Sequence, residues 1–325
     1  MEPKQTSRRQ FIKAGAATLG AAGLAAKAHA QNQSPSTDPQ RGGKYWPGGE
    51  RLVISISTQF EAGGEPEFNM ESPFSGNPLP KPYPDLPART WFQYGYREGI
   101  PRLLDLWDEF NIKVTSHMVG DAVVKNPDLA KEMVRRGHEA AAHGMSWDNQ
   151  FDMSRDEEKR FIAKGVEAVE KATGKTPLGY NCNWLRRSTN TLSILQELGF
   201  TYHIDDLSRD EPFIVPVNDK PFVIVPYTLR CNDIALIEGR HFSTDQFYHQ
   251  LKDEFDQLYR ESAKRRVMMS ISTHDRIGGA PGVVNAIRRF LEYATKHEGL
   301  SFKRKDEIAR ISLKSPTTIK EKVAT

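Results

Sequence analysis

The chain has 325 residues, of which 38% are hydrophobic and 27% are charged, so it can form a packed core and is not a wholly disordered protein. Its formal net charge of +3 comes from residues 1–30, which carry five cations and one anion and leave the remainder with a net charge of −1. The body therefore has no basic field for nucleic acid. The two cysteines, Cys182 and Cys231, are too few for a disulfide scaffold or a thiolate zinc site. They are predicted to be buried thiols, with one optional disulfide as the alternative.

The N-terminal segment has the features of an export signal. Ser7–Lys13 (SRRQFIK) is a twin-arginine pattern, the 13 residues Ala14–Ala26 form a weakly apolar run, and Ala28–Ala30 is a small-x-small cleavage site. Because a helix needs about 20 apolar residues to span a bilayer, no stable membrane insertion is expected. Residues 1–30 are predicted to be a Tat signal peptide, carried by the Tat translocase, which places the folded protein in the periplasm or outside the cell. Residues 31–49 are predicted to be a flexible linker.

The body begins with a strand and a long loop. Alternating branched apolar residues predict a strand over Arg51–Thr58. Residues 59–96 contain seven prolines and no sustained period, which predicts a long loop.

Further along, helical and strand periods alternate. Helices are predicted over Arg102–Phe110, 126–137, 154–174, Thr189–Leu198, Ser243–Lys264 and Val283–Leu291; strands are predicted over Lys113–Val119, Glu139–Ala142, Leu178–Asn181, at Tyr202, and over Phe213–Val217, Phe222–Val225, Arg266–Ser272 and Ser301–Lys303. This alternation predicts an α/β fold with a parallel sheet and crossover helices. We expect a single irregular (β/α) barrel over residues 50–314, followed by a polar tail over 315–325.

Polar clusters follow three of the predicted strands. Glu61 lies in a glycine-rich segment after the first strand, His143 ends the segment 140–143, and His274 is followed by Asp-Arg and a glycine-rich turn. Each cluster has a structural alternative: a solvated turn, a core histidine bonded to a carbonyl, or a polar loop. Because the carboxyl ends of barrel strands meet at one mouth, the sequence predicts that these three side chains surround one pocket.

Four motifs extend this pattern: Phe60–Glu65, His143-Gly144-x-x-Trp147, Val225–Asp233, and Thr273–Gly278 followed by Pro281-Gly282. Through them, residues 50–312 resemble the polysaccharide deacetylase (NodB-homology) superfamily, and within it the cofactor-independent allantoinase-type branch. The resemblance implies an irregular (β/α) barrel and hydrolysis of a C–N amide bond.

One departure from the superfamily concerns the metal. Its metal-dependent members hold a divalent ion with an aspartate of the first motif and two histidines four residues apart. Here Trp147 stands at the second histidine position and Ser57–Ala62 contains no aspartate, so His143 alone remains. Even with Glu61 as a substitute, the set falls short of the three protein ligands of catalytic zinc. No metal and no other cofactor are therefore expected.

The sequence thus predicts an exported hydrolase of non-peptide C–N bonds, acting on a small amide or an N-acetylated glycan. Glu61 or His274 is expected to be the general base, and His143 to polarise the carbonyl. Expected substrate-binding residues are Trp147, Arg276, Asn232 and Asp233. Two alternatives are a non-catalytic relative that binds a glycan or an amide, and a metal-dependent N-deacetylase with altered ligands. The oligomeric state is left open.

Overall fold

The computed structural model describes residues 46–66, 72, 77, 79–80 and 82–323; the expected signal peptide and most of the linker lie outside them. The strands are β1 (Leu52–Phe60), β2 (Thr115–Met118), β3 (Glu139–Ala142), β4 (Gly179–Tyr180), β5 (Tyr202–His203), β6 (Phe213–Val217), β7 (Lys220–Ile224), β8 (Met268–His274), β9 (Leu300–Phe302) and β10 (Ile319–Lys320). The helices are α1 (Leu86–Tyr94), α2 (Ile100–Glu109), α3 (Gly120–Lys125), α4 (Pro127–Arg135), α5 (Arg155–Thr173), α6 (Thr191–Glu197), α7 (Thr244–Glu261), α8 (Asp275–Gly278), α9 (Pro281–Ala294) and α10 (Lys305–Lys314), with π turns η1 (Gly95–Gly99) and η4 (Ile234–Glu238) and 3₁₀ turns η2 (Gln150–Asp152) and η3 (Asn183–Leu185).

The strands form one mostly parallel sheet in the order β10-β6-β7-β5-β4-β3-β2-β1-β8, with β9 paired to β1. Only β6 and β7 pair antiparallel among the described strands. The segment after β7 forms one isolated bridge to β8, Asn232 to Ser272, but the described ladders do not close the sheet by hydrogen bonds. The predicted α/β fold with an irregular (β/α) barrel is confirmed in this open form.

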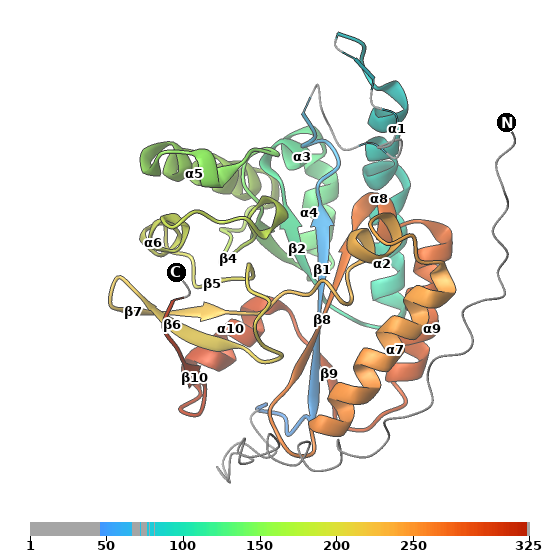
Figure 1. The fold of residues 1–325 in the computed structure, drawn as a ribbon, viewed down its shortest axis with the longest axis vertical. Coiled ribbons are helices and arrows are strands. Elements are labelled where there is room, and N and C mark those ends of the chain that lie inside the picture. Colours follow the sequence, from blue (N-terminus) through green and yellow to red (C-terminus); the bar gives the residue numbers. More distant parts are fainter. Residues whose placement is uncertain (1–45, 67–71, 73–76, 78, 81, 324–325) are drawn as a thin grey trace, which may run out of the picture. The chain divides into compact units, whose positions relative to one another are not determined.

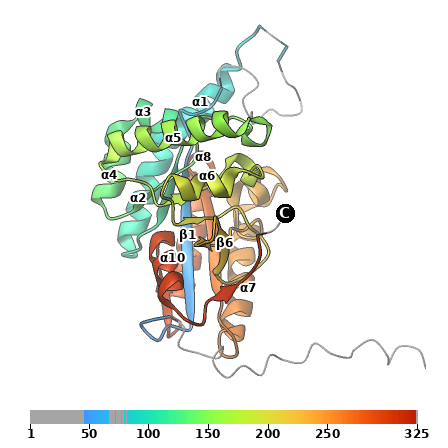
Figure 2. The same ribbon diagram turned by 90° about the vertical axis from the view of Figure 1, so that its left-hand side faces the viewer.

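Helices cover the sheet on both sides of β1 (Figure 1). The helices α2, α7 and α9 pack on β1 and β8 through a cluster that includes Trp107, Phe255 and Phe290. On the other side α5 and α6 lie side by side, as Figure 2 shows. Among the described helices none is long and apolar enough to cross a membrane. Both cysteines are buried and free, which is the predicted state without the optional disulfide.

The structure contains elements that were not predicted, among them α1 in the segment 59–96, α3, α8 and α10 elsewhere, and β10 near the C-terminus. The segment 59–96, predicted as loop, contains α1, because the Asp85 side chain accepts the Ala88 N–H as an N-cap and a proline occupies the first turn. The seven prolines of this segment favoured a loop, so the N-cap at Asp85 was not recognised from the sequence. Beyond Lys314, where the polar tail was expected, β10 pairs with β6.

Candidate active site

The strand register brings the functional positions to one level. Phe60 pairs with Met118, Met118 with Ala142, and Ala142 with Tyr180. The residues directly after β1, β3 and β4 are therefore Glu61, His143 and Asn181, at matching heights. On the other side of β1, Gln59 pairs with His274 at the end of β8.

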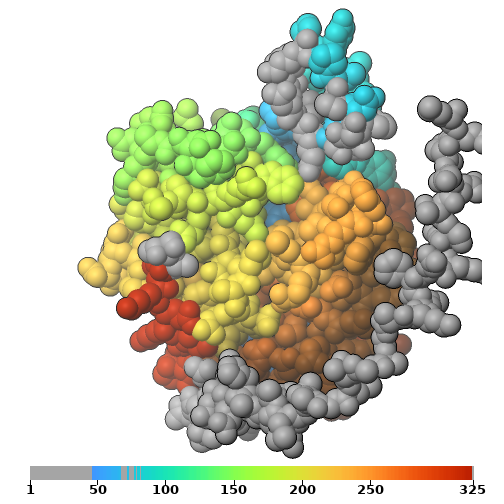
Figure 3. Space-filling view, in the orientation of Figure 1, coloured from blue at the N-terminus to red at the C-terminus, as the bar shows by residue number. Residues whose placement is uncertain are grey.

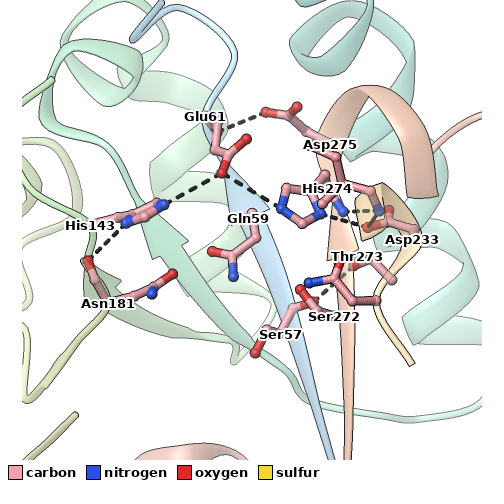
Figure 4. Close-up of polar contacts among 12 residues, drawn as sticks. Ser57, Gln59, Glu61, His143, Asn181, Asp233, Ser272, Thr273, His274 and Asp275 are labelled. Atoms are coloured by element: carbon pink, nitrogen blue, oxygen red, sulfur yellow. Dashed lines mark hydrogen bonds and ion pairs between the residues drawn. The ribbon is translucent and has the colours of Figure 1, made fainter. Parts of the chain in front are cut away.

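Glu61, His143 and His274 converge, as Figure 4 shows. The Nε2 atoms of His143 and His274 lie 3.4 and 3.8 Å from the same atom, Oε1 of Glu61. All three side chains are buried and line one pocket of about 550 Å³. In Figure 3 the surface is hollowed between the yellow-green and the orange segments, which contribute much of this pocket's lining.

Each histidine is oriented through its other ring nitrogen. The Nδ1 of His143 is 2.8 Å from the carbonyl oxygen of Asn181; because a carbonyl only accepts, Nδ1 carries the hydrogen and Nε2 faces Glu61. The Nδ1 of His274 is 2.5 Å from Oδ1 of Asp233, whose Oδ2 accepts the His274 backbone N–H at 2.6 Å. Asp233 is fully buried and does not line the pocket. It was predicted to bind substrate, but the structure places it behind His274.

The charges around Glu61 and His274 separate their roles. Burial alone would raise the pKa of Glu61, but the positive charges of His274, Arg276 and His143 outweigh it and hold the pKa well below its ordinary range. Burial alone would lower the pKa of His274, but the carboxylates of Asp233 and Glu61 outweigh it and raise the pKa. Glu61 is thus a weak base, whereas His274 holds a proton readily.

Arg276 was also predicted to bind substrate, and its position is different. Its Nη1 lies 2.6 Å from Oε2 of Glu61, the residue is 2% exposed, and it does not line the pocket. Its guanidinium carbon lies 4.7, 4.4 and 5.6 Å from the ring centroids of Trp91, Phe92 and Trp147, within cation–π range. Arg276 therefore fixes Glu61 from behind, inside a box of aromatic side chains.

Trp147 and Asn232 line the pocket. Trp147 is also one of the aromatic side chains around Arg276. The residue at the second histidine position of the metal-dependent members thus contacts a guanidinium here. Asn232 donates from Nδ2 to the Tyr227 hydroxyl at 3.3 Å, and Gln59 donates to the same hydroxyl at 2.9 Å. Tyr227 and Gln59 also line the pocket. Tyr227 lies in the Val225–Asp233 motif, but neither residue was predicted as a site residue.

Asp275 is a residue that sequence reasoning missed. Its Oδ2 accepts the N–H groups of Glu61 and Ala62 at 2.8 and 2.7 Å, and burial raises its pKa to about 6. The π turn η1 packs against it: a Cβ at Gly99 would lie 1.9 Å from the Asp275 carbonyl oxygen, and one at Gly95 2.7 Å from its Cγ. The two glycines, four residues apart, and the aspartate between His274 and Arg276 were the available signals.

The donor set does not fit the metal of the metal-dependent deacetylases. Within the described ranges no group of three or more histidine, cysteine, aspartate or glutamate side chains is arranged to hold an ion. Of the two oxygens of Glu61, Oε2 is paired with Arg276. A divalent ion at Glu61 would lie beside a buried guanidinium, whose positive charge opposes it.

Comparisons with known proteins find similarities in sequence and in fold. The family model described as polysaccharide deacetylase matches residues 88–203. A Schizosaccharomyces pombe protein named for polysaccharide deacetylases is 30% identical over 291 residues, which is 82% of this chain and 91% of its own. The Helicobacter pylori peptidoglycan deacetylase is 28% identical over 249 residues, or 66% and 84% of the two chains. The crystal structure of Puue allantoinase superposes with a TM-score of 0.78 at 32% identity, covering 85% of this chain and 95% of that one. A Pseudomonas aeruginosa PAO1 structure of the deacetylase type gives 0.76 at 31% identity, with 83% and 93% covered.

Proposed function

Because the chain belongs to the polysaccharide deacetylase family, we propose that it hydrolyses a non-peptide amide C–N bond and does so without a metal ion. One observation carries the proposal: two buried imidazoles present Nε2 to the same oxygen of Glu61 on one pocket, and each is locked at Nδ1. Such an arrangement supplies a base, an acid and a stabilising anion within reach of one substrate carbonyl. The substrate is a small amide or an N-acetylated glycan.

The proton positions favour His143 as the base. When His143 is neutral, its Nδ1–H donates to the Asn181 carbonyl, so Nε2 carries a lone pair that can take a proton from water. Once Nε2 is protonated, the imidazolium pairs with Oε1 of Glu61, 3.4 Å away. The water oxygen then attacks the amide carbon. His274, whose pKa is raised by Asp233 and Glu61 against the effect of burial, carries a proton on Nε2 that stabilises the oxyanion. This assignment reverses the histidine roles expected from residue types alone.

The second step breaks the C–N bond. The proton on Nε2 of His274 passes to the leaving nitrogen, and the products are a carboxylic acid and an amine. His143 has gained one proton and His274 has lost one, so transfer between them through solvent restores the starting state. Glu61 remains ionised throughout, because its two imidazoles and Arg276 stabilise the anion. Each group would contribute as acids and bases ordinarily do, by about 10²–10⁴ in rate.

The test is a substrate panel with matched histidine variants. The purified protein is assayed against N-acetylglucosamine oligomers, peptidoglycan fragments, cyclic ureides such as allantoin and simple N-acetyl amines. His143→Ala and His274→Ala should each lower kcat/KM by about 10²–10⁴ while retaining the wild-type circular dichroism spectrum. His249→Ala, an exposed histidine on α7, is the control and should change little. Near-wild-type activity in both pocket variants contradicts the mechanism, and failure to cleave any amide favours the non-catalytic alternative.

Export is a separate part of the proposal. The twin arginines and the Ala28–Ala30 cleavage pattern support transport by the Tat translocase and a periplasmic or secreted location. These residues lie outside the part of the chain that the structure describes, so the sequence alone supports this part.

A further inference from the structure

The pocket has a polar floor and walls that are largely apolar. Glu61 and the two histidines form the reactive part, while seven large apolar side chains line much of the rest: Trp91, Trp147, Trp184, Leu185, Leu207, Leu229 and Ile234. Ten large apolar side chains are exposed in the described residues, and three of them, Trp184, Leu207 and Leu229, line this one pocket. Exposed apolar side chains that gather at a cavity mark a surface that a ligand covers.

Trp184 is held in place at a cost in backbone strain. Its φ and ψ are 53° and 24°, and Leu185 follows with a φ of 60°. Two successive bulky residues in the left-handed region are uncommon, and such strain collects at functional sites. The indole is 57% exposed and meets Trp147 edge-on, with ring centroids 6.5 Å apart. Trp184 therefore extends the aromatic box of Arg276 outward to the solvent.

The segment that carries Trp184 also carries the partner of a catalytic histidine. Asp205 accepts the Cys182 backbone N–H at 3.1 and 3.0 Å and the Asn181 amide at 2.7 Å, which anchors the start of the turn. The Asn181 carbonyl in turn holds His143. An apolar group of a ligand packed against Trp184 would thus be held at a fixed position relative to His143, the proposed base.

We infer that the site prefers a compact amide bearing an apolar ring or chain over an amide on a hydroxyl-rich sugar; this deepens the proposed function and rests on it. Sugar hydroxyls that leave water need hydrogen-bond partners, and indole faces and leucine side chains offer none. An apolar ring instead gains free energy as its surface leaves water. Polar side chains such as Arg186, Glu238 and His241 also line the pocket, so the apolar wall meets only part of the ligand.

The experiment compares two amides that differ only in their ring. N-cyclohexylacetamide and N-acetylglucosamine share the acetyl amide and a six-membered ring, and the released amine is measured in both cases. The expected result is a kcat/KM at least about tenfold higher for the cyclohexyl amide, in the range that an apolar pocket discriminates. Trp184→Ala and Leu229→Ala should each lower this ratio by about tenfold. Leu313→Ala is the matched control, because Leu313 is 41% exposed and Leu229 44%, but Leu313 does not line the pocket.

Binding separates this inference from the proposed function. Binding of both amides is measured by calorimetric titration into the wild type and into His274→Ala. The variant is used because its slow cleavage lets binding be measured apart from turnover. Tighter binding of N-cyclohexylacetamide without any turnover would overturn the proposed function and leave the apolar preference standing. A preference for N-acetylglucosamine in kcat/KM or in binding overturns the inference. So does a ratio that neither Trp184→Ala nor Leu229→Ala changes.

Discussion

The Asp233–His274 pair provides the sharpest test of the proposed roles. Replacing Asp233 by asparagine removes a buried negative charge whose Oδ1 lies 2.5 Å from Nδ1 of His274. The shape of the side chain is preserved, and its amide oxygen can still accept one of the two backbone N–H groups that Asp233 binds, those of His274 and Ile234. The substitution therefore changes the charge beside His274 more than it changes the structure.

The magnitude follows from the geometry. Two opposite unit charges about 4 Å apart interact by about 4 kcal/mol at an effective dielectric constant of about 20, which corresponds to about three pH units. The amide dipole and the remaining Glu61 carboxylate retain part of this effect, so the pKa of His274 should fall by about one to three units. Because His274 acts as the acid, the activity is lost as the pH rises through this pKa. Asp233→Asn therefore moves the basic limb of the pH–rate profile to lower pH.

The assay is kcat/KM against pH on an amide that the wild type cleaves, together with an NMR titration of the histidine ring protons, which needs no turnover. The control is Asp245→Asn. Asp245 also pairs with a histidine, His249, at 3.5 Å, but the two side chains are 63% and 59% exposed. Solvent screens that pair, so both measurements should stay close to wild type.

Three results would refute the reasoning. An unmoved basic limb in Asp233→Asn means that Asp233 does not set the pKa of His274. A shift of the acidic limb alone means that His274 is the base and His143 the acid, the reverse of our assignment. A fall in rate with no change in the NMR titration means that the aspartate acts on geometry and not on charge.

The remaining predictions concern stability, metal and export. Arg276→Met leaves Glu61 buried without its guanidinium partner, so we expect the free energy of unfolding in urea to fall by about 3–5 kcal/mol. Arg288→Met is the control, because it breaks a more exposed pair, with Glu109, of the same 2.6 Å length and should lower the free energy of unfolding by less than about 1 kcal/mol. Equal losses would show that burial does not decide the effect. EDTA should leave kcat/KM unchanged and elemental analysis should find well under one zinc per chain; activity abolished by chelation and restored by zinc rules this out. Changing Arg8 and Arg9 together to lysine should retain the precursor in the cytoplasm, and its normal appearance in the periplasm would exclude the Tat route.

Much of the architecture and the location of the site followed from local pattern. The alternation of strand and helix periods predicts a parallel sheet, and parallel strands bring their carboxyl ends to one edge. Glu61, His143 and His274 each follow or end such a strand, so their meeting at one pocket needed no knowledge of which strand pairs with which. The helix α5 was equally accessible, because its capping box begins at Ser154 and its left-handed cap lies at Gly174.

The partners of these residues were decided by the tertiary structure. Asp233 is 41 residues from His274, and Asn181 is 38 residues from His143. Asn181 acts through its backbone carbonyl, a group that every residue has and that leaves no trace in a sequence. Asp233 was expected to bind substrate because it follows a predicted strand, and Arg276 because a guanidinium can bind a carboxylate. In the folded chain each is buried and contacts a side chain of opposite charge. Residue type determines which chemistry is available, but a pKa and a proton position depend on neighbours from distant strands, which only packing brings within a few ångströms.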